Sequence, residues 1–142
     1  MTEVDKSTSS VIAGDFTPYL EAIRNDRISF TRCSTCQTWI WPPTNYCPRC
    51  KENSVTWVTL PEGTGGTVFS FIIVRHTTIP EFKDLLPYVL GIVSVDGTDI
   101  RLIGRVLCVT DDVAIGDGLA PSFEGERDDP VINWNLARQR TR

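Results

Sequence analysis

The sequence predicts a mostly β protein in which a short helix and a four-cysteine metal ribbon precede a small closed β-barrel. Three observations support this prediction. Two Cys-x-x-Cys pairs, at 33–36 and 47–50, fall within 18 residues. From residue 55 onward, β-branched and aromatic residues alternate with polar ones, and glycine-containing turns separate the runs. One short stretch near residue 20 has the spacing of an amphipathic helix.

The order of these signals divides the chain into four parts. We expect an N-terminal segment with a short helix over 1–28, a zinc ribbon over 29–54, an OB-type barrel over 55–126 and a C-terminal tail over 127–142. Thr17 is the expected N-cap of the helix, and Pro18 its first residue. Leu20 and Ile23 share one helix face, and the pattern ends near Asn25.

The cysteine spacing predicts a metal site. Cys33 and Cys36 are separated from Cys47 and Cys50 by ten residues, enough for a short hairpin that joins the two pairs. The N-terminus has no apolar run behind a basic start, so no export signal is predicted and disulfides are disfavoured. Four thiolates suit one tetrahedral Zn²⁺ and fill its coordination sphere, so the zinc should be structural. A redox dithiol and an iron site of rubredoxin type are the alternatives.

The β signals after residue 55 predict the barrel. Strands are expected over the ranges 55–59, 67–77, 88–95, 100–106 and 119–124. Asp96-Gly97 is a tight hairpin signal between two of them. Strands of this kind with glycine turns favour a small closed barrel, because closure leaves no exposed sheet edge.

The sequence offers few candidates for catalysis, and no catalytic residue is predicted. His76 is the single histidine, and at a strand end we expect a surface or hydrogen-bonding role rather than that of a general base. Cys108 follows two apolar residues, which favours a buried, inert thiol. Neither a Gly-x-Ser-x-Gly elbow nor a phosphate-binding glycine loop occurs. We therefore expect a chain that is not catalytic by itself.

Charge limits the classes of partner. Fourteen basic and 18 acidic residues give a net charge of −4 and a pI near 4.9, which is a poor match for nucleic-acid phosphates. A nucleic-acid-binding zinc-ribbon/OB protein is nevertheless the alternative function, because both modules recur in such proteins. Five aromatic residues could stack on bases, although a core or interface role is favoured for them: Trp39, Trp41, Tyr46, Phe69 and Phe71. No apolar stretch of about 18 residues predicts a membrane span, and a cytoplasmic location is expected.

The ordered motifs resemble the DUF35 family. They are Phe30-x-x-Cys33-x-x-Cys36, Trp41-Pro42-Pro43, Cys47-Pro48-x-Cys50, Trp57, Gly66-Thr67-Val68-Phe69-Ser70-Phe71, Pro87-Tyr88-Val89, and Ile115-Gly116 before Ser122-Phe123-Glu124. The resemblance covers residues 16 to 124. Members of this family are OB-fold, acyl-CoA-associated proteins with a rubredoxin-like zinc ribbon. One departure concerns the turns, because Gln37 and Lys51 follow knuckle cysteines where many relatives have glycine.

The resemblance implies a non-catalytic accessory subunit that forms a hetero-oligomer with a thiolase-like catalytic subunit. The partner's reaction would be a thiolytic, condensing or retro-aldol step, for example in the degradation of aromatic or steroid acids. A CoA thioester would be bound jointly with the partner, and structural Zn²⁺ would be the metal. No nucleic acid and no membrane is expected as a partner.

Two segments are candidates for contact with the partner or its CoA. The apolar loop at 77–87 carries Phe82 and Leu85, which are costly to leave in water, and its alternative role is a lid over one barrel end. The tail carries Trp134, Arg138 and Arg140, and an exposed tryptophan beside arginines is typical of an interface anchor. The arginines could meet acidic groups or CoA phosphates. The alternative for Trp134 is packing against the barrel.

Overall fold

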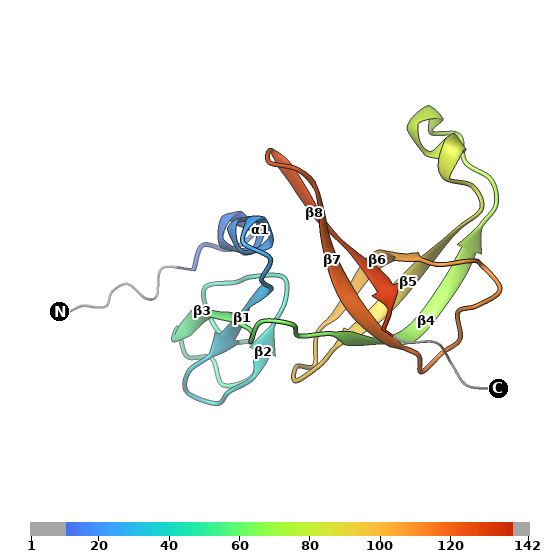
Figure 1. Ribbon diagram of the computed structural model, residues 1–142. Coiled ribbons are helices and arrows are strands. Elements are labelled where there is room, and N and C mark those ends of the chain that lie inside the picture. The colour runs from blue at the N-terminus through green and yellow to red at the C-terminus, as the bar shows by residue number, and fades with distance from the viewer. Residues whose placement is uncertain (1–10, 138–142) are drawn as a thin grey trace. The chain divides into compact units, whose positions relative to one another are not determined.

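The computed structural model describes residues 11–137 of the chain, which divide into two compact units. The first unit ends at Glu62 and the second begins at Gly63. One contains the helix and a three-stranded sheet, and the other is a closed five-stranded barrel (Figure 1). The predicted mostly β architecture, with one short helix, is confirmed. Within residues 11–137, no helix has the length and apolarity that a membrane crossing requires.

Helix α1 spans Thr17–Arg24, and its N-terminal cap differs from the prediction. Phe16 occupies the N-cap position and makes no side-chain capping bond. The Asp15 carboxylate instead accepts hydrogen bonds from the Thr17 hydroxyl, at 2.7 Å, and from the Thr17 amide, at 3.0 Å. These two bonds lower the pKa of Asp15. Thr17 therefore lies inside the helix, and an acidic residue before it fulfils the capping role.

The sheet of the first unit has β1 (Ser29–Cys33) at its centre, between β2 (Trp39–Ile40) and β3 (Val55–Thr59). All five residues of β3 pair with β1 in antiparallel register. The sequence pattern predicts these residues as the first strand of the barrel, whereas in the structure they pair with β1 in the ribbon sheet. The strand pattern was recognised correctly, but alternation identifies a strand without identifying its partner.

An aromatic cluster packs against this sheet, with Trp41 at its centre. The Trp41 ring centroid lies 4.8 Å from Phe30, 5.1 Å from Tyr19, 5.4 Å from Phe16 and 5.9 Å from Trp57. Phe30 is completely buried, and burial raises the pKa of Tyr19 to about 12. Trp41, one of the aromatics considered for base stacking, therefore packs among other aromatic rings of the first unit.

The barrel strands follow the order β4-β5-β6-β8-β7 around the closed sheet. Their bounds are Gly66–Val74 for β4, Tyr88–Val95 for β5, Arg101–Leu107 for β6, Gly118–Glu126 for β7 and Asp129–Leu136 for β8. The short 3₁₀ helix η1 (Pro80–Leu85) lies between β4 and β5. Strand β8 runs parallel to β6 and antiparallel to β7, and β7 closes the barrel on the first two residues of β4. The predicted closed barrel is thus present.

The C-terminal segment is a barrel strand rather than a separate tail. Eight residue pairs join β8 to β7, and Trp134 also pairs with Val106 of β6. Trp134 is completely buried, and a Cβ atom on Gly104 would lie only 2.9 Å from its indole ring. The prediction of Trp134 as an exposed anchor is therefore wrong, and the packing alternative is correct. Gly125 and Pro130 pair with each other near the β7–β8 turn, so they do not separate this segment from the barrel.

Candidate metal centre

Two short turns of the first unit bring the four predicted cysteine ligands together. Cys33 ends β1 and Cys36 lies in the turn that follows, while Cys47 and Cys50 lie in a second turn before β3. All four Sγ atoms lie within 4.8 Å of one another, with 3.6 Å between Cys33 and Cys50 and 3.6 Å between Cys36 and Cys47. A tetrahedral Zn²⁺ with Zn–S bonds of about 2.3 Å spaces its ligands about 3.8 Å apart. The cluster therefore fits a four-thiolate metal site.

The turns keep their shape although glycine is missing from both. Gln37 and Lys51 adopt left-handed φ values of 67° and 69°, a conformation that favours glycine. Their amides donate to the carbonyl groups of Cys33 and Cys47, each at 2.9 Å. Their side chains donate to the carbonyl three residues earlier, at 3.1 Å from Gln37 and 2.9 Å from Lys51. These bonds hold the two turns in the conformation that the ligands need.

Hydrogen-bond donors surround the sulfur atoms. The backbone amides of Cys36 and Cys50 point at the sulfur of the first cysteine in their own turns, each at 3.5 Å. The hydroxyl of Thr38 lies 3.0 Å from the Cys36 sulfur, and that of Ser54 lies 3.6 Å from the Cys33 sulfur. Such donors stabilise thiolates, which are the form that binds metal.

The pKa values of the Cys33 and Cys50 thiols are shifted in opposite directions. Burial raises the pKa of Cys33, but hydrogen bonds from the Cys36 amide and the Ser54 hydroxyl outweigh it and lower that pKa to about 6. The Glu52 amide lowers the pKa of Cys50, yet burial and the neighbouring thiols raise it to about 12. Without a cation, adjacent thiolates repel one another, so a bound metal ion would relieve this repulsion.

Two of the basic residues beside the cysteines contact the turns. The Arg32 guanidinium lies 4.7 Å from the Trp39 ring centroid, and its Nε donates to the Gln37 carbonyl at 3.2 Å. Lys51 is held against its own turn by the side-chain bond described above. Carbonyl groups of the two turns thus hold both cationic side chains against the ribbon.

The residues predicted to contact the partner differ in their exposure to solvent. Phe82 on η1 is 40% exposed, and its ring meets Tyr88 edge-on with the centroids 6.3 Å apart. Leu85 is half-buried. Trp134 lies in the barrel interior, as described above, and Arg138 and Arg140 lie outside the described residues. Phe82 and Leu85 thus remain candidates for contact on the second unit.

Sequence reasoning missed a group of exposed and half-buried apolar side chains on the outer face of β4, β5 and β6. The most exposed members are Ile103, at 73%, and Ile72, at 60%. The alternation of residues in β6 could have indicated this group. Ile103 lies on the same face of the strand as Arg101 and Arg105, and a face with two arginines is expected to be exposed.

Comparison with known families accounts for both units. Residues 20–55 match the ChsH2 rubredoxin-like zinc ribbon domain, and residues 57–124 match the ChsH2 C-terminal OB-fold domain. Fold and site together define a zinc-ribbon protein with an OB-fold barrel. The chain belongs to the DUF35 family.

Individual relatives extend this comparison. The chain is 33% identical over 95 residues to a probable enoyl-CoA hydratase alpha subunit of Thermomonospora curvata, over 66% of this chain and 28% of that protein. It thus spans little more than a quarter of that relative. It is 27% identical over 107 residues to a DUF35 domain-containing scaffold protein of Methanocaldococcus jannaschii, over 72% and 74% of the two chains. In the solved Ltp2-ChsH2(DUF35) aldolase, a chain matches with a TM-score of 0.74 and 26% identity, over 89% of this chain and 98% of that one.

Proposed function

We propose that this chain is a non-catalytic accessory subunit of a thiolase-superfamily enzyme that acts on an acyl-CoA. The observation that carries the proposal is the likeness of both units together to a chain of the Ltp2-ChsH2(DUF35) aldolase. The names of two further relatives, a scaffold protein and a hydratase subunit, also describe parts of larger assemblies. Among thiolytic, condensing and retro-aldol steps, the likeness to an aldolase favours a retro-aldol step for the partner.

The chemistry of the metal centre supports a structural rather than a catalytic role. Zn²⁺ would be held by Cys33, Cys36, Cys47 and Cys50, which leave no coordination position for water or substrate. The ion would then stabilise the ribbon, because Cys33 and Cys47 belong to its buried core and metal-binding energy is coupled to folding. Under this proposal the chain contributes surfaces to the assembly, and the partner contributes the reacting groups.

The barrel unit supplies candidate surfaces for that assembly. Phe82 and Leu85 on η1 would contact the catalytic subunit, and their partial exposure leaves apolar area to bury. Arg138 and Arg140 would meet acidic groups of the partner or the phosphates of its CoA. A CoA thioester would then be bound jointly by the two chains.

Co-expression tests this function. The full chain should be produced together with each thiolase-superfamily protein encoded in its source genome, with an affinity tag on one of the two chains. We expect the two to co-purify in a fixed ratio and to elute as one hetero-oligomer. Separate elution of two folded proteins, together with salt-dependent binding of the chain to single-stranded DNA or RNA, would instead favour the nucleic-acid-binding alternative.

A further inference from the structure

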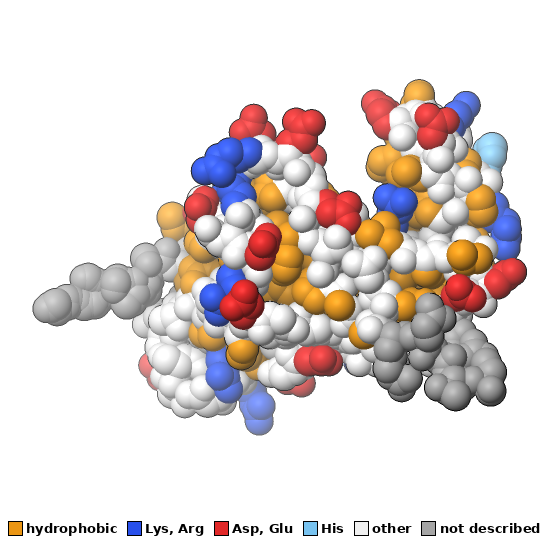
Figure 2. Space-filling view, in the orientation of Figure 1, with side chains coloured by type: hydrophobic (Ala, Val, Ile, Leu, Met, Phe, Trp, Pro, Cys, Tyr) orange, Lys and Arg blue, Asp and Glu red, His pale blue; other side chains and the backbone are white. Residues whose placement is uncertain are grey.

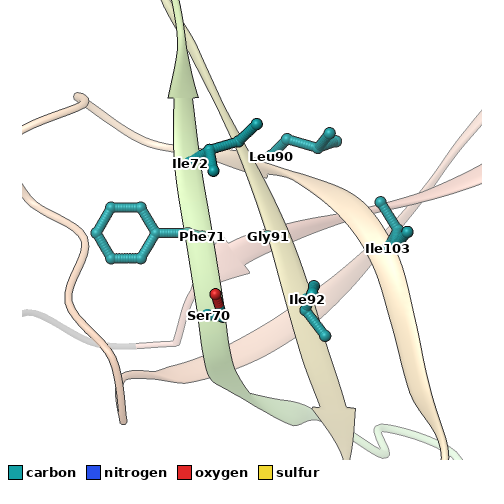
Figure 3. A pocket seen from close by; sticks show the side chains of 7 residues that line it. All are labelled: Ser70, Phe71, Ile72, Leu90, Gly91, Ile92 and Ile103. Carbon is teal, nitrogen blue, oxygen red and sulfur yellow. The ribbon is translucent and has the colours of Figure 1, made fainter.

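The outer face of β4, β5 and β6 carries an apolar hollow. Ile72, Leu90, Ile92 and Ile103 line it, together with Ser70 and Phe71, and its volume is about 160 Å³ (Figure 3). Figure 3 shows Phe71 pointing away from Ile72, Leu90, Ile92 and Ile103. Side chains on the solvent face of a barrel are usually polar. Two exposed isoleucines, Ile72 and Ile103, beside the half-buried Leu90 and Ile92 therefore indicate a surface that another molecule covers.

The strand register makes this hollow continuous. Leu90 lies between Ile72 and Arg105 in one row across the three strands. Ile92 lies beside Ile103 in the next row. Because neighbouring residues in a row are about 5 Å apart, their side chains form one surface rather than isolated apolar points.

The same face extends toward η1. Tyr88 lies two residues before Leu90 and therefore on the same side of β5. The Phe82 ring of η1 meets Tyr88 edge-on. The candidate residue Phe82 thus lies at one end of the apolar surface, and one partner could cover both.

Two arginines border the hollow. The Arg101 guanidinium lies 3.9 Å from the centroid of the half-exposed Phe69 ring. Arg105 shares the row of Leu90, and its Nε is buried without a hydrogen-bond partner among the residues that the structure describes. Buried N–H groups normally have acceptors. The residue as a whole is only half-buried, so a partner's carboxylate would pair with the accessible nitrogen atoms of this guanidinium, as arginine does in paired hydrogen bonds with carboxylates.

We propose that this surface, here called the β4–β6 face and formed by Ile72, Leu90, Ile92, Ile103, Arg101 and Arg105, docks an apolar segment of the catalytic subunit that carries a carboxylate for Arg105. The identity of that subunit rests on the proposed function. The chain has a net charge of −4, so two arginines beside an apolar centre are unlike its average composition. Apolar centres with arginine at the border are typical of interfaces between different proteins.

A second copy of this chain fits the same face less well. In a two-fold symmetric contact the same patch meets itself, and the β4–β6 face carries two arginines and no acidic side chain that could pair with them. Like charges held together at an interface oppose association. An acidic partner surface avoids this repulsion and supplies opposite charges for both arginines, so the charges favour a different protein.

A matched pair of substitutions tests the docking surface. Ile103 and Ile115 are 73% and 68% exposed, and Ile115 lies in the β6–β7 connection outside the β4–β6 face. With full-length chains and the co-expressed catalytic subunit, Ile103→Asp should weaken binding at least about tenfold, and Ile115→Asp should leave it unchanged. Both side chains are exposed, so thermal unfolding and zinc content should match the wild type. Isothermal titration calorimetry measures the affinities.

Charge-changing substitutions at Ile103 and Arg105 test whether the partner's surface is acidic. Ile103→Lys should weaken binding less than Ile103→Asp, because lysine complements an acidic partner and aspartate opposes it. Arg105→Glu should likewise weaken binding more than Arg105→Gln. Equal affinities within each pair would overturn the acidic partner.

The remaining outcomes separate this inference from the proposed function. Wild-type affinity of Ile103→Asp for the catalytic subunit would overturn the docking face and leave the accessory role intact. No binding by the wild-type chain would overturn both. If the wild-type chain forms a homodimer that Ile103→Asp abolishes without changing affinity for the catalytic subunit, the face belongs to a second copy and the inference fails.

Discussion

Replacement of Trp134 by alanine is expected to lower the free energy of unfolding of the barrel unit by about 3–5 kcal/mol. Trp134 is completely buried and heads the largest fully buried side chains of the described residues. It also lies where the barrel closes, because its strand β8 joins β6 to β7. Loss of the indole would leave a cavity over Gly104, whose missing side chain makes room for the ring. Urea unfolding followed by circular dichroism measures the change.

Val131→Ala is the control for this experiment. Val131 lies on the same strand but is 38% exposed, so its truncation should change stability by less than about 1 kcal/mol. Equal stabilities of Trp134→Ala and Val131→Ala would contradict the packing described here. Deletion of residues 131–142 should unfold the barrel, since most of β8 is removed, whereas a chain ending at Ala137 retains every described residue of the barrel and should stay folded.

Replacement of Cys47 by serine is expected to abolish stoichiometric zinc binding and unfold the ribbon unit. Cys47 is completely buried within the four-sulfur cluster. Structural zinc sites contribute about 10–16 kcal/mol of apparent binding free energy, more than most small domains have to spare, and that energy is coupled to folding. Elemental analysis of freshly purified protein should give one zinc per wild-type chain and well under one per Cys47→Ser chain.

Two variants show whether the effect belongs to the metal. Lys51→Gly changes the backbone of the same turn but no ligand, and its left-handed φ of 69° suits glycine, so zinc should be retained. Cys108→Ser removes a thiol outside the cluster and should also retain it. A Cys47→Ser chain with one zinc and wild-type thermal stability would contradict the four-cysteine site. One iron per wild-type chain, without zinc, would instead support the rubredoxin-type iron site that is the alternative to a zinc site.

The metal site was predictable because its signal is local. Two Cys-x-x-Cys pairs determine which sulfur atoms lie in each turn, and only a short connection separates them. The sequence shows that Gln37 and Lys51 stand where many relatives have glycine, but it does not show which conformation these two residues adopt. Side-chain hydrogen bonds to the turn carbonyls accompany the left-handed conformation, and they require coordinates to be seen.

Strand partners were less predictable than strands. The residues of β3 alternate as a strand should, yet their partner β1 lies more than 20 residues earlier, and no local feature distinguishes it from a barrel strand. For β8 the sequence does contain a strand pattern, because the apolar Ile132 and Trp134 alternate with Asn133 and Asn135. In the structure Ile132 and Trp134 are buried, while Val131 and Asn135 are exposed. Pro130 obscured it, because proline suggests a break although it is tolerated near the start of a strand.

The most direct test of the accessory role is acyl-CoA turnover by the purified catalytic subunit, measured with and without this chain. Candidate thioesters, including β-hydroxyacyl-CoA substrates for a retro-aldol step, are supplied at saturating concentration. The proposed function predicts little turnover by either protein alone and full turnover when wild-type chain is added at the ratio of the complex. Turnover by the catalytic subunit alone that this chain leaves unchanged would contradict it, as would turnover by this chain in isolation.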